Sequence, residues 1–163
     1  MSETPPTDYE LYLRVPELLR LQKQPSELSC PDELLFQVVH QAAELWMKLA
    51  DHEMKLLGPM ISSDRLAEAS KSLRRVHTVL ALITQSLETL YTLTPSDYMR
   101  IRAVLGRGSG QESPGFKRML TVPSEVYPHF ETLLAKRALQ LIELYREPSR
   151  YAAAHWLARA YAL

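Results

Sequence analysis

One histidine, His40, lies in an otherwise apolar stretch of the chain. Spacings of four, three and four residues bring a stripe of side chains onto one helix face there: Phe36, His40, Ala43 and Met47. A second apolar stripe runs beside it: Leu35, Val39, Ala42, Trp46 and Leu49. We expect this helix to be buried over most of its circumference, so that His40 faces protein or a ligand. Its imidazole then either bonds a backbone carbonyl or a carboxylate such as Glu44, or serves a ligand.

A second stretch, residues 93–110, combines a phenol, a guanidinium and several glycines. Tyr98 and Arg102 are one helical turn apart, so both side chains can converge on one small anion. The planar fork of an arginine suits a carboxylate. Ser109 adds a hydroxyl beside three glycines that let the backbone approach a ligand: Gly106, Gly108 and Gly110. Taken alone, these features are also compatible with an ordinary protein surface.

Metal sites built only from side chains have little support in the sequence. The chain contains neither Glu-x-x-His, which argues against a ferritin-like di-iron bundle, nor His-Glu-x-x-His. The one cysteine, Cys30, excludes an internal disulfide and lacks the surroundings of a catalytic thiol. The methionines are better interpreted as core residues than as axial ligands.

Composition indicates one globular helical domain over residues 1–163, of which 46% are hydrophobic. Nineteen basic residues balance nineteen acidic ones, so the charge favours neither nucleic acid nor an anionic membrane as a partner. The polar, proline-bearing first residues are not typical of a signal or transit peptide. No apolar stretch approaches the roughly 20 residues of a membrane span. We therefore expect a cytoplasmic protein.

Hydrophobic periodicity and the positions of the prolines predict an all-α fold, because strand-like alternation is almost absent. Pro31, Thr94 and the pair Ser63-Asp64 mark expected helix starts, while Gly58-Pro59 and Glu147-Pro148 mark expected ends. A glycine-rich loop is expected after the fourth helix. The predicted helices cover residues 16–24, 32–57, 64–91, 95–105, 124–146 and 149–163.

Taken together, these segments resemble the tryptophan 2,3-dioxygenase family of heme enzymes. Asp32–Lys48 is similar to the family's Asp-Glu-Met-Leu-Phe followed by His-Gln-x-x-Glu-Leu-Trp-x-Lys. Leu93–Gly110 is similar to its Leu-Thr-Pro-x-x-Tyr/Phe-x-x-Phe-Arg-x-x-Leu-x-x-x-Ser-Gly. Upstream, Tyr9–Leu13 and Leu18–Gln22 resemble its Tyr-x-x-Tyr-Leu and Leu-Leu-x-x-Gln. The order and spacing match over most of the chain.

This resemblance implies a helical bundle around heme b, with an aromatic amino acid and O2 as substrates. Phe36 and His40 would line the pocket above the heme, with His40 bonding the indole nitrogen. Arg102, helped by Tyr98, would hold the substrate carboxylate. The residues implied beside the heme are Phe36, Ser109 and Gly110. The family also implies a homotetramer in which N-terminal residues complete a neighbouring site, here Tyr9, Tyr12 and Leu13.

Two departures from the family pattern leave the reaction and the iron ligand open. Residues 111–117 read Gln-Glu-Ser-Pro-Gly-Phe-Lys where the family has Phe-Gln-Ser-x-Gln-Phe-Arg. The family's Leu-Trp-x-x-x-His ligand segment and Gly-Thr-Gly-Gly-Ser loop do not occur. We therefore expect a domain that lacks the heme-ligand region or is truncated before it, with His155 only a weak candidate for the iron ligand.

The main hypothesis is insertion of O2 across the indole C2–C3 bond of L-tryptophan or a close derivative. This reaction gives N-formylkynurenine, as in the kynurenine pathway of tryptophan catabolism. A second hypothesis is heme-dependent mono-oxygenation or hydroxylation of a tryptophan or tyrosine derivative in natural-product biosynthesis. A third is a non-catalytic subunit, without iron, that binds aromatic amino acids or supports assembly.

Overall fold

The structure is a computed structural model that describes residues 5–146. These residues form helices and no strand, which confirms the predicted all-α class. Short 3-10 turns lie at Pro25–Glu27, Thr89–Thr92 and Gly110–Glu112. The α-helices are α1 (Asp8–Leu13), α2 (Val15–Leu18), α3 (Glu33–Ser62), α4 (Leu66–Glu88), α5 (Pro95–Leu105), α6 (Pro114–Lys136) and α7 (Leu141–Arg146).

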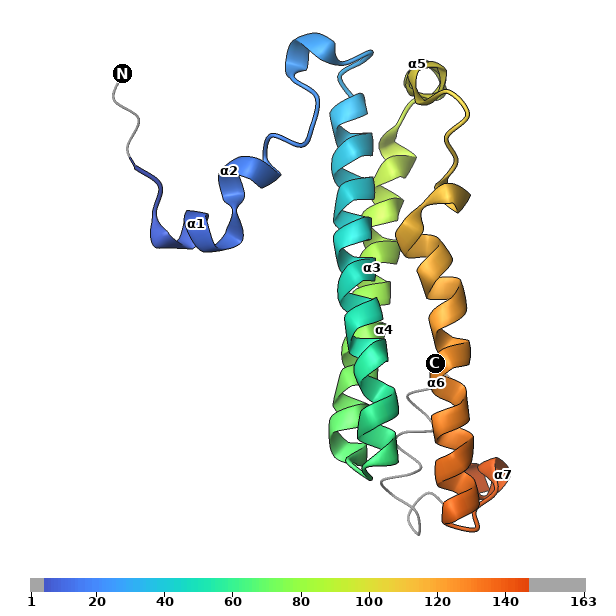
Figure 1. Ribbon diagram of the computed structural model, residues 1–163. Coiled ribbons are helices and arrows are strands. Elements are labelled where there is room, and N and C mark those ends of the chain that lie inside the picture. The colour runs from blue at the N-terminus through green and yellow to red at the C-terminus, as the bar shows by residue number, and fades with distance from the viewer. Residues whose placement is uncertain (1–4, 147–163) are drawn as a thin grey trace.

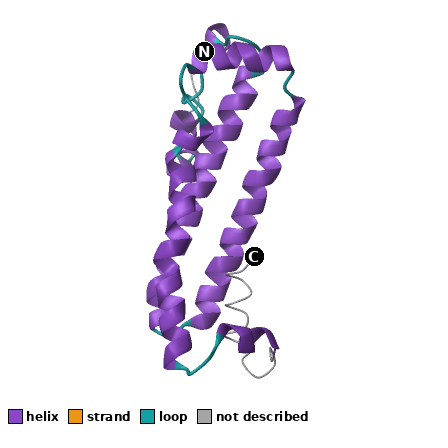
Figure 2. Ribbon diagram, turned by 90° about the vertical axis from the view of Figure 1, so that its right-hand side faces the viewer, coloured by secondary structure: helices purple, strands orange, loops and turns teal. Residues whose placement is uncertain are grey.

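The long helices α3, α4 and α6 run side by side and α5 lies across one end of them (Figures 1 and 2). The core lies where α3 meets the other two, and its fully covered residues include Ala50, Leu57 and Phe130. Buried positions of α3 recur every three or four residues, which is the period that places them on one face. They are Val39, Ala43, Met47, Ala50, Met54, Leu57 and Ile61.

The opposite face of α3 is open, so the expectation that this helix is buried over most of its circumference is wrong. Leu34, Val38 and Leu45 lie on that face and are exposed. In the described part of the chain α3 packs mainly against α4 and α6, and two neighbours cover only one side of a helix. The stripe that contains His40 is on the covered side, at the end of the bundle near α5.

The N-terminal segment reaches away from the bundle (Figure 1). A predicted helix over residues 16–24 is only partly correct, because α2 ends at Leu18 and a separate helix, α1, precedes it. Thr7 starts α1 by a capping box with Glu10. Beyond α2, the backbone N–H of Lys23 donates to the side chain of Gln37 on α3 at 3.0 Å instead of continuing a helix. Gln24 is extended, as expected of a residue before proline.

The second predicted helix runs past its expected end, because Gly58 and Pro59 lie inside α3. Gly58 is needed for packing rather than for termination: a Cβ atom there would lie 2.7 Å from Nε2 of His129 on α6. The pair Ser63-Asp64 does not cap the next helix either. Asp64 has a positive φ of 60°, and Arg65 is the residue that precedes α4.

Helix α5 confirms its predicted bounds, with Thr94 as the N-cap and Pro95 in the first turn. The helix predicted over 124–146 is wrong at its start, because α6 begins at Pro114 and contains Pro123 and Pro128. That range is also interrupted between α6 and α7. The predicted helix 149–163, which contains His155, lies outside the described residues. Across residues 5–146, no helix is long and apolar enough to cross a membrane.

Candidate functional site

His40 projects from the covered face of α3 and its hydrogen bond defines its tautomer. Nδ1 lies 2.7 Å from the carbonyl oxygen of Phe36, one turn earlier. A carbonyl only accepts, so Nδ1 carries the proton and, in the neutral ring, Nε2 keeps a free lone pair. The Phe36 ring packs on the imidazole with centroids 4.1 Å apart and planes tilted by 33°. His40 can therefore accept one hydrogen bond from a ligand while its ring stays oriented.

An apolar cavity of about 360 Å³ adjoins His40 between α3, α4 and the start of α6. Its walls combine apolar side chains of the long helices with the polar segment that leads into α6. They are His40, Ala43, Glu44, Met47, Ile83, Leu87, Ser109, Gly110, Gln111, Ser113 and Phe116. Such a lining suits a flat apolar group with a few polar atoms at its edge.

A second cavity, of about 320 Å³, lies on the side of His40 toward α5. It contains the predicted carboxylate-binding pair Tyr98 and Arg102 together with Phe36. His40, Ser109 and Gly110 line both cavities, so the two spaces meet at the imidazole and the glycine-rich loop. The fold thus brings together residues that are about 70 positions apart in the sequence. Their separation along the chain does not by itself show that they are neighbours.

Arg102 is held by the loop that follows α5. Its Nη1 donates to the carbonyl oxygens of Gly106 at 2.7 Å and Gly108 at 3.0 Å. Gly106 has a positive φ of 64°, a conformation that favours glycine. No carboxylate among the described residues pairs with Arg102, so Nη2 and Nε remain for an anionic ligand. The guanidinium is therefore oriented before any ligand binds.

Ser109 caps the 3-10 turn Gly110–Glu112. Its Oγ accepts from the Gln111 N–H at 3.2 Å, and the Glu112 carboxylate accepts from the Ser109 N–H at 3.0 Å. The hydroxyl hydrogen of Ser109 is thus available as a donor at the junction of the two cavities. The departure from the family pattern at Gln111-Glu112 has a local consequence: Glu112 closes this capping box, and Gln111 contributes a polar side chain to the apolar cavity.

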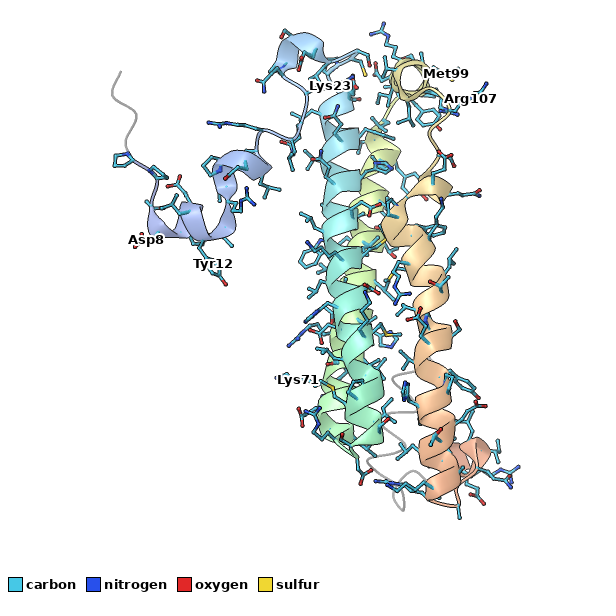
Figure 3. The ribbon with its side chains drawn as sticks, in the orientation of Figure 1. Asp8, Tyr12, Lys23, Lys71, Met99 and Arg107 are labelled. Atoms are coloured by element: carbon cyan, nitrogen blue, oxygen red, sulfur yellow. The ribbon has the colours of Figure 1, made fainter. Side chains whose placement is uncertain are left out.

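The residues Tyr9, Tyr12 and Leu13 are not brought to His40 within one chain. They lie on α1, which has no buried residue, and neither cavity includes them. Tyr12 is 87% exposed, and Figure 3 shows it on the projecting segment, apart from the long helices. The predicted role of these three residues in a neighbouring subunit stays a prediction.

Glu44 belongs to the site in a role that the sequence analysis did not predict. Its carboxylate does not bond His40; it accepts from the Ser113 hydroxyl and, at 3.1 Å, from the Gly115 N–H. This joins the helix that carries His40 to the first turn of α6. The Ser113-Pro114 pair, a typical helix start, was the available signal for this contact.

Ion pairs secure the helix that carries the site. Burial alone favours the neutral acid of Glu33, but hydrogen bonds from Lys23 and Ser29 outweigh it and lower the pKa of Glu33 to about 2. On Asp51, burial is likewise outweighed by bonds from Lys55 and Arg118, which lower its pKa. Glu33 ties the N-terminal segment to α3, and Asp51 ties α3 to α6.

The comparison with known proteins decides the family. The family model described as tryptophan 2,3-dioxygenase matches residues 1–122. The chain belongs to this family. Curated tryptophan 2,3-dioxygenases are 38% identical over 147 residues in Bacillus thuringiensis (strain Al Hakam) and 41% identical over 111 residues in Erythrobacter litoralis. The match with the protein of Saccharopolyspora erythraea is 37% over 151 residues.

These alignments cover only part of each tryptophan 2,3-dioxygenase. The three matches include 90%, 68% and 88% of this chain but 48%, 41% and 52% of the respective relatives. The chain therefore spans about half the length of the curated relatives it matches. The family prediction made from residues 9–110 is confirmed, and the matched range contains both cavities.

Proposed function

We propose that this chain binds L-tryptophan, or a close derivative, beside a heme b and takes part in O2 insertion across the indole C2–C3 bond, giving N-formylkynurenine. The observation that carries the proposal is the position of His40. Its oriented imidazole, with Nε2 free to accept, stands where an apolar cavity meets a cavity that contains Arg102. Membership of the tryptophan 2,3-dioxygenase family supports the same reaction.

The polar groups match the two ends of an aromatic amino acid. Nε2 of His40 accepts the indole N–H, and the free donors of Arg102 bind the carboxylate, with Tyr98 beside them. A ligand that lacks the N–H leaves Nε2 unpaired in a largely apolar site, which costs on the order of 1–3 kcal/mol. Two fixed contacts orient the ring, and orientation is the main contribution that a protein makes to such a reaction.

A porphyrin would lie against the apolar cavity, next to the aromatic ligand. Ala43, Met47, Ile83 and Leu87 supply apolar wall, while Ser109 and Gly110 stand at its edge with a hydroxyl and an open backbone. When bound, heme supplies the redox chemistry that activates dioxygen. Within residues 5–146 no group of three or more His, Cys, Asp or Glu could hold a metal ion. A heme iron would be held largely by its porphyrin, so it would not need such a cluster of side chains.

Partners and compartment are part of the same proposal. The exposed apolar residues Tyr9, Tyr12 and Leu13 on the projecting arm favour contact with a second copy of the chain, and we propose a homotetramer in which this arm completes a neighbouring site. Burial of apolar side chains on association supplies the driving force. The single buried cysteine, Cys30, suits the reducing cytoplasm.

Heme reconstitution and product analysis test the proposal. The purified chain incubated with heme should show a Soret band, and addition of L-tryptophan, reductant and O2 should give N-formylkynurenine detectable by mass. H40A should reduce turnover at least about tenfold, through loss of the N–H acceptor, with heme content retained. H52A, at an exposed position on the same helix, is the matched control.

Three outcomes would contradict parts of this function. A colourless chain that takes up no heme but binds L-tryptophan would favour the non-catalytic binding subunit. Incorporation of one oxygen atom instead of two would favour the mono-oxygenase. Equal loss of heme and turnover in H40A would refute the assignment of His40 to the substrate side.

A further inference from the structure

Among the described residues, one carboxylate of α3 hydrogen-bonds the wall of the cavity opposite His40. Glu44 follows His40 by one helical turn, and both residues line the apolar cavity. The Glu44 carboxylate accepts from the Ser113 hydroxyl with one oxygen and from the Gly115 N–H, at 3.1 Å, with the other. Both donors belong to the segment that leads into α6. That segment forms the far wall of the cavity, so the two bonds help to fix its distance from α3.

The close approach of this segment to α3 requires a glycine. A Cβ atom at Gly115 would lie 2.6 Å from Oε2 of Glu44 and 2.8 Å from Cε of Met47. Neither distance is tolerated without movement of the two helices or of these side chains. The sequence thus provides, 71 residues apart, an acceptor at Glu44 and a residue small enough to reach it.

The same contacts orient an aromatic residue of the cavity. The Ser113 hydroxyl donates to Glu44 and accepts from the N–H of Phe116 at 3.0 Å, as the N-cap of α6. Phe116 lines the cavity one turn into the helix. A carboxylate at a helix N-terminus is further stabilised by the helix dipole. Glu44 therefore holds the loop, the cap and the aromatic wall as one unit.

We propose that Glu44 is a positioning residue: through Ser113 and Gly115 it sets the width of the cavity beside His40 and thereby the affinity for the aromatic ligand. The effect on ligand affinity rests on the proposed function. The bonds from Ser113 and Gly115 to Glu44, which we call the clamp, can be tested without any ligand. Glu44 acts through the wall and not by contact with the reacting atoms.

A second carboxylate on α3 distinguishes this positioning role from a general contribution to the stability of the helix pair. Asp51 also joins α3 to α6, through Arg118 at 2.5 Å, but it lies away from both cavities. D51N should lower the stability of the α3–α6 contact without changing the wall at residues 109–116. It is the matched control for E44Q, because each substitution replaces one interhelical carboxylate by the isosteric amide.

The first measurement is amide hydrogen exchange on the full chain without added ligand. E44Q keeps an acceptor for the Gly115 N–H but loses the charge, and its amide nitrogen can only donate to the Ser113 oxygen, so the bond in which a carboxylate accepts from the Ser113 hydroxyl is lost. Exchange over residues 109–116 should accelerate about tenfold or more in E44Q and remain within about twofold of the unaltered protein in D51N. Equal exchange over this segment in E44Q and the unaltered protein would overturn the proposal.

The second measurement is the dissociation constant of L-tryptophan for the heme-loaded chain. E44Q should weaken binding about tenfold and S113A should have a similar effect. The double variant should lose little more, because both substitutions remove the same bond, from the Ser113 hydroxyl to the Glu44 carboxylate. A full multiplicative loss in the double variant would contradict a shared clamp. If the unaltered chain binds neither heme nor L-tryptophan, the proposed function fails, while the exchange rates still decide whether Glu44 holds the wall.

Discussion

The carboxylate of Glu33 should make the stability of this protein depend on pH in a predictable window. The residue is 3% exposed, and its carboxylate accepts from Nζ of Lys23 at 2.5 Å and from the Ser29 N–H at 2.6 Å. These bonds overcome the effect of burial and lower the pKa of Glu33 from 4.5 to about 2. The folded state therefore binds this proton more weakly than the unfolded state does. Stability from Glu33 is fully present above pH 4.5 and is lost as the pH falls toward 2.

The magnitude follows from the size of the pKa change. At about 1.4 kcal/mol per pKa unit, the full displacement corresponds to at most about 3.5 kcal/mol. The side chain of Lys23 is 39% exposed, and solvent screening of such a partner reduces the expected contribution to about 1–2 kcal/mol. E33Q retains the shape of the side chain and part of its hydrogen bonding but cannot titrate.

Urea unfolding at pH 6 and at pH 3 measures this contribution. Other acidic groups with lowered pKa values, including Asp51 and Glu53, titrate in the same range, so both proteins lose stability on acidification. The unaltered protein should lose about 1–2 kcal/mol more than E33Q between the two pH values. An identical loss in the two proteins would refute the argument that the bonds from Lys23 and Ser29 set the pKa of Glu33.

Three further substitutions have defined outcomes. R102K should weaken binding of L-tryptophan about tenfold in a titration and leave the affinity for indole unchanged. Lysine cannot bond both loop carbonyls and the ligand carboxylate at once. Equal losses of affinity for the two ligands would contradict the carboxylate role of Arg102. G58A should destabilise the chain by about 1–3 kcal/mol in urea unfolding, since its methyl group meets His129, and an unchanged midpoint would show that His129 moves away freely. R75M should cost about 1–2 kcal/mol in the same assay, because it leaves the buried carboxylate of Glu53 without its ion-pair partner. A neutral result would mean that water replaces Arg75.

Local sequence was sufficient for the helical class, and together with the family pattern it indicated part of the lining of the two cavities: Phe36, His40, Tyr98, Arg102, Ser109 and Gly110. Thr94 and Pro95 start α5 where expected because a cap and its partners lie within a few residues of each other. Phe36 and His40 share a face of α3 because the helical period alone places them there, and the bond between them spans a single turn. The family pattern then connected this helix with Arg102, and the structure places Phe36, His40 and Arg102 around one cavity.

The predicted helix boundaries were wrong where tertiary packing outweighed local sequence preference. Gly58 and Pro59 are typical of a helix end, yet α3 continues to Ser62 because Gly58 accommodates His129 of α6. Pro123 likewise lies inside α6, whose start was expected only after it. A proline removes one backbone hydrogen bond, and burial of the helix along the bundle core compensates for that loss.

The sequence by itself determined which helix carries the imidazole, which carries the guanidinium, and which family they belong to. Only the tertiary structure decided the partner of Glu44, which is not His40 one turn away but Ser113, 69 residues further along the chain. The physical reason is the range of each interaction. Helical periodicity acts over a few residues, whereas the width of the cavity beside His40 depends on how closely α3 and α6 pack.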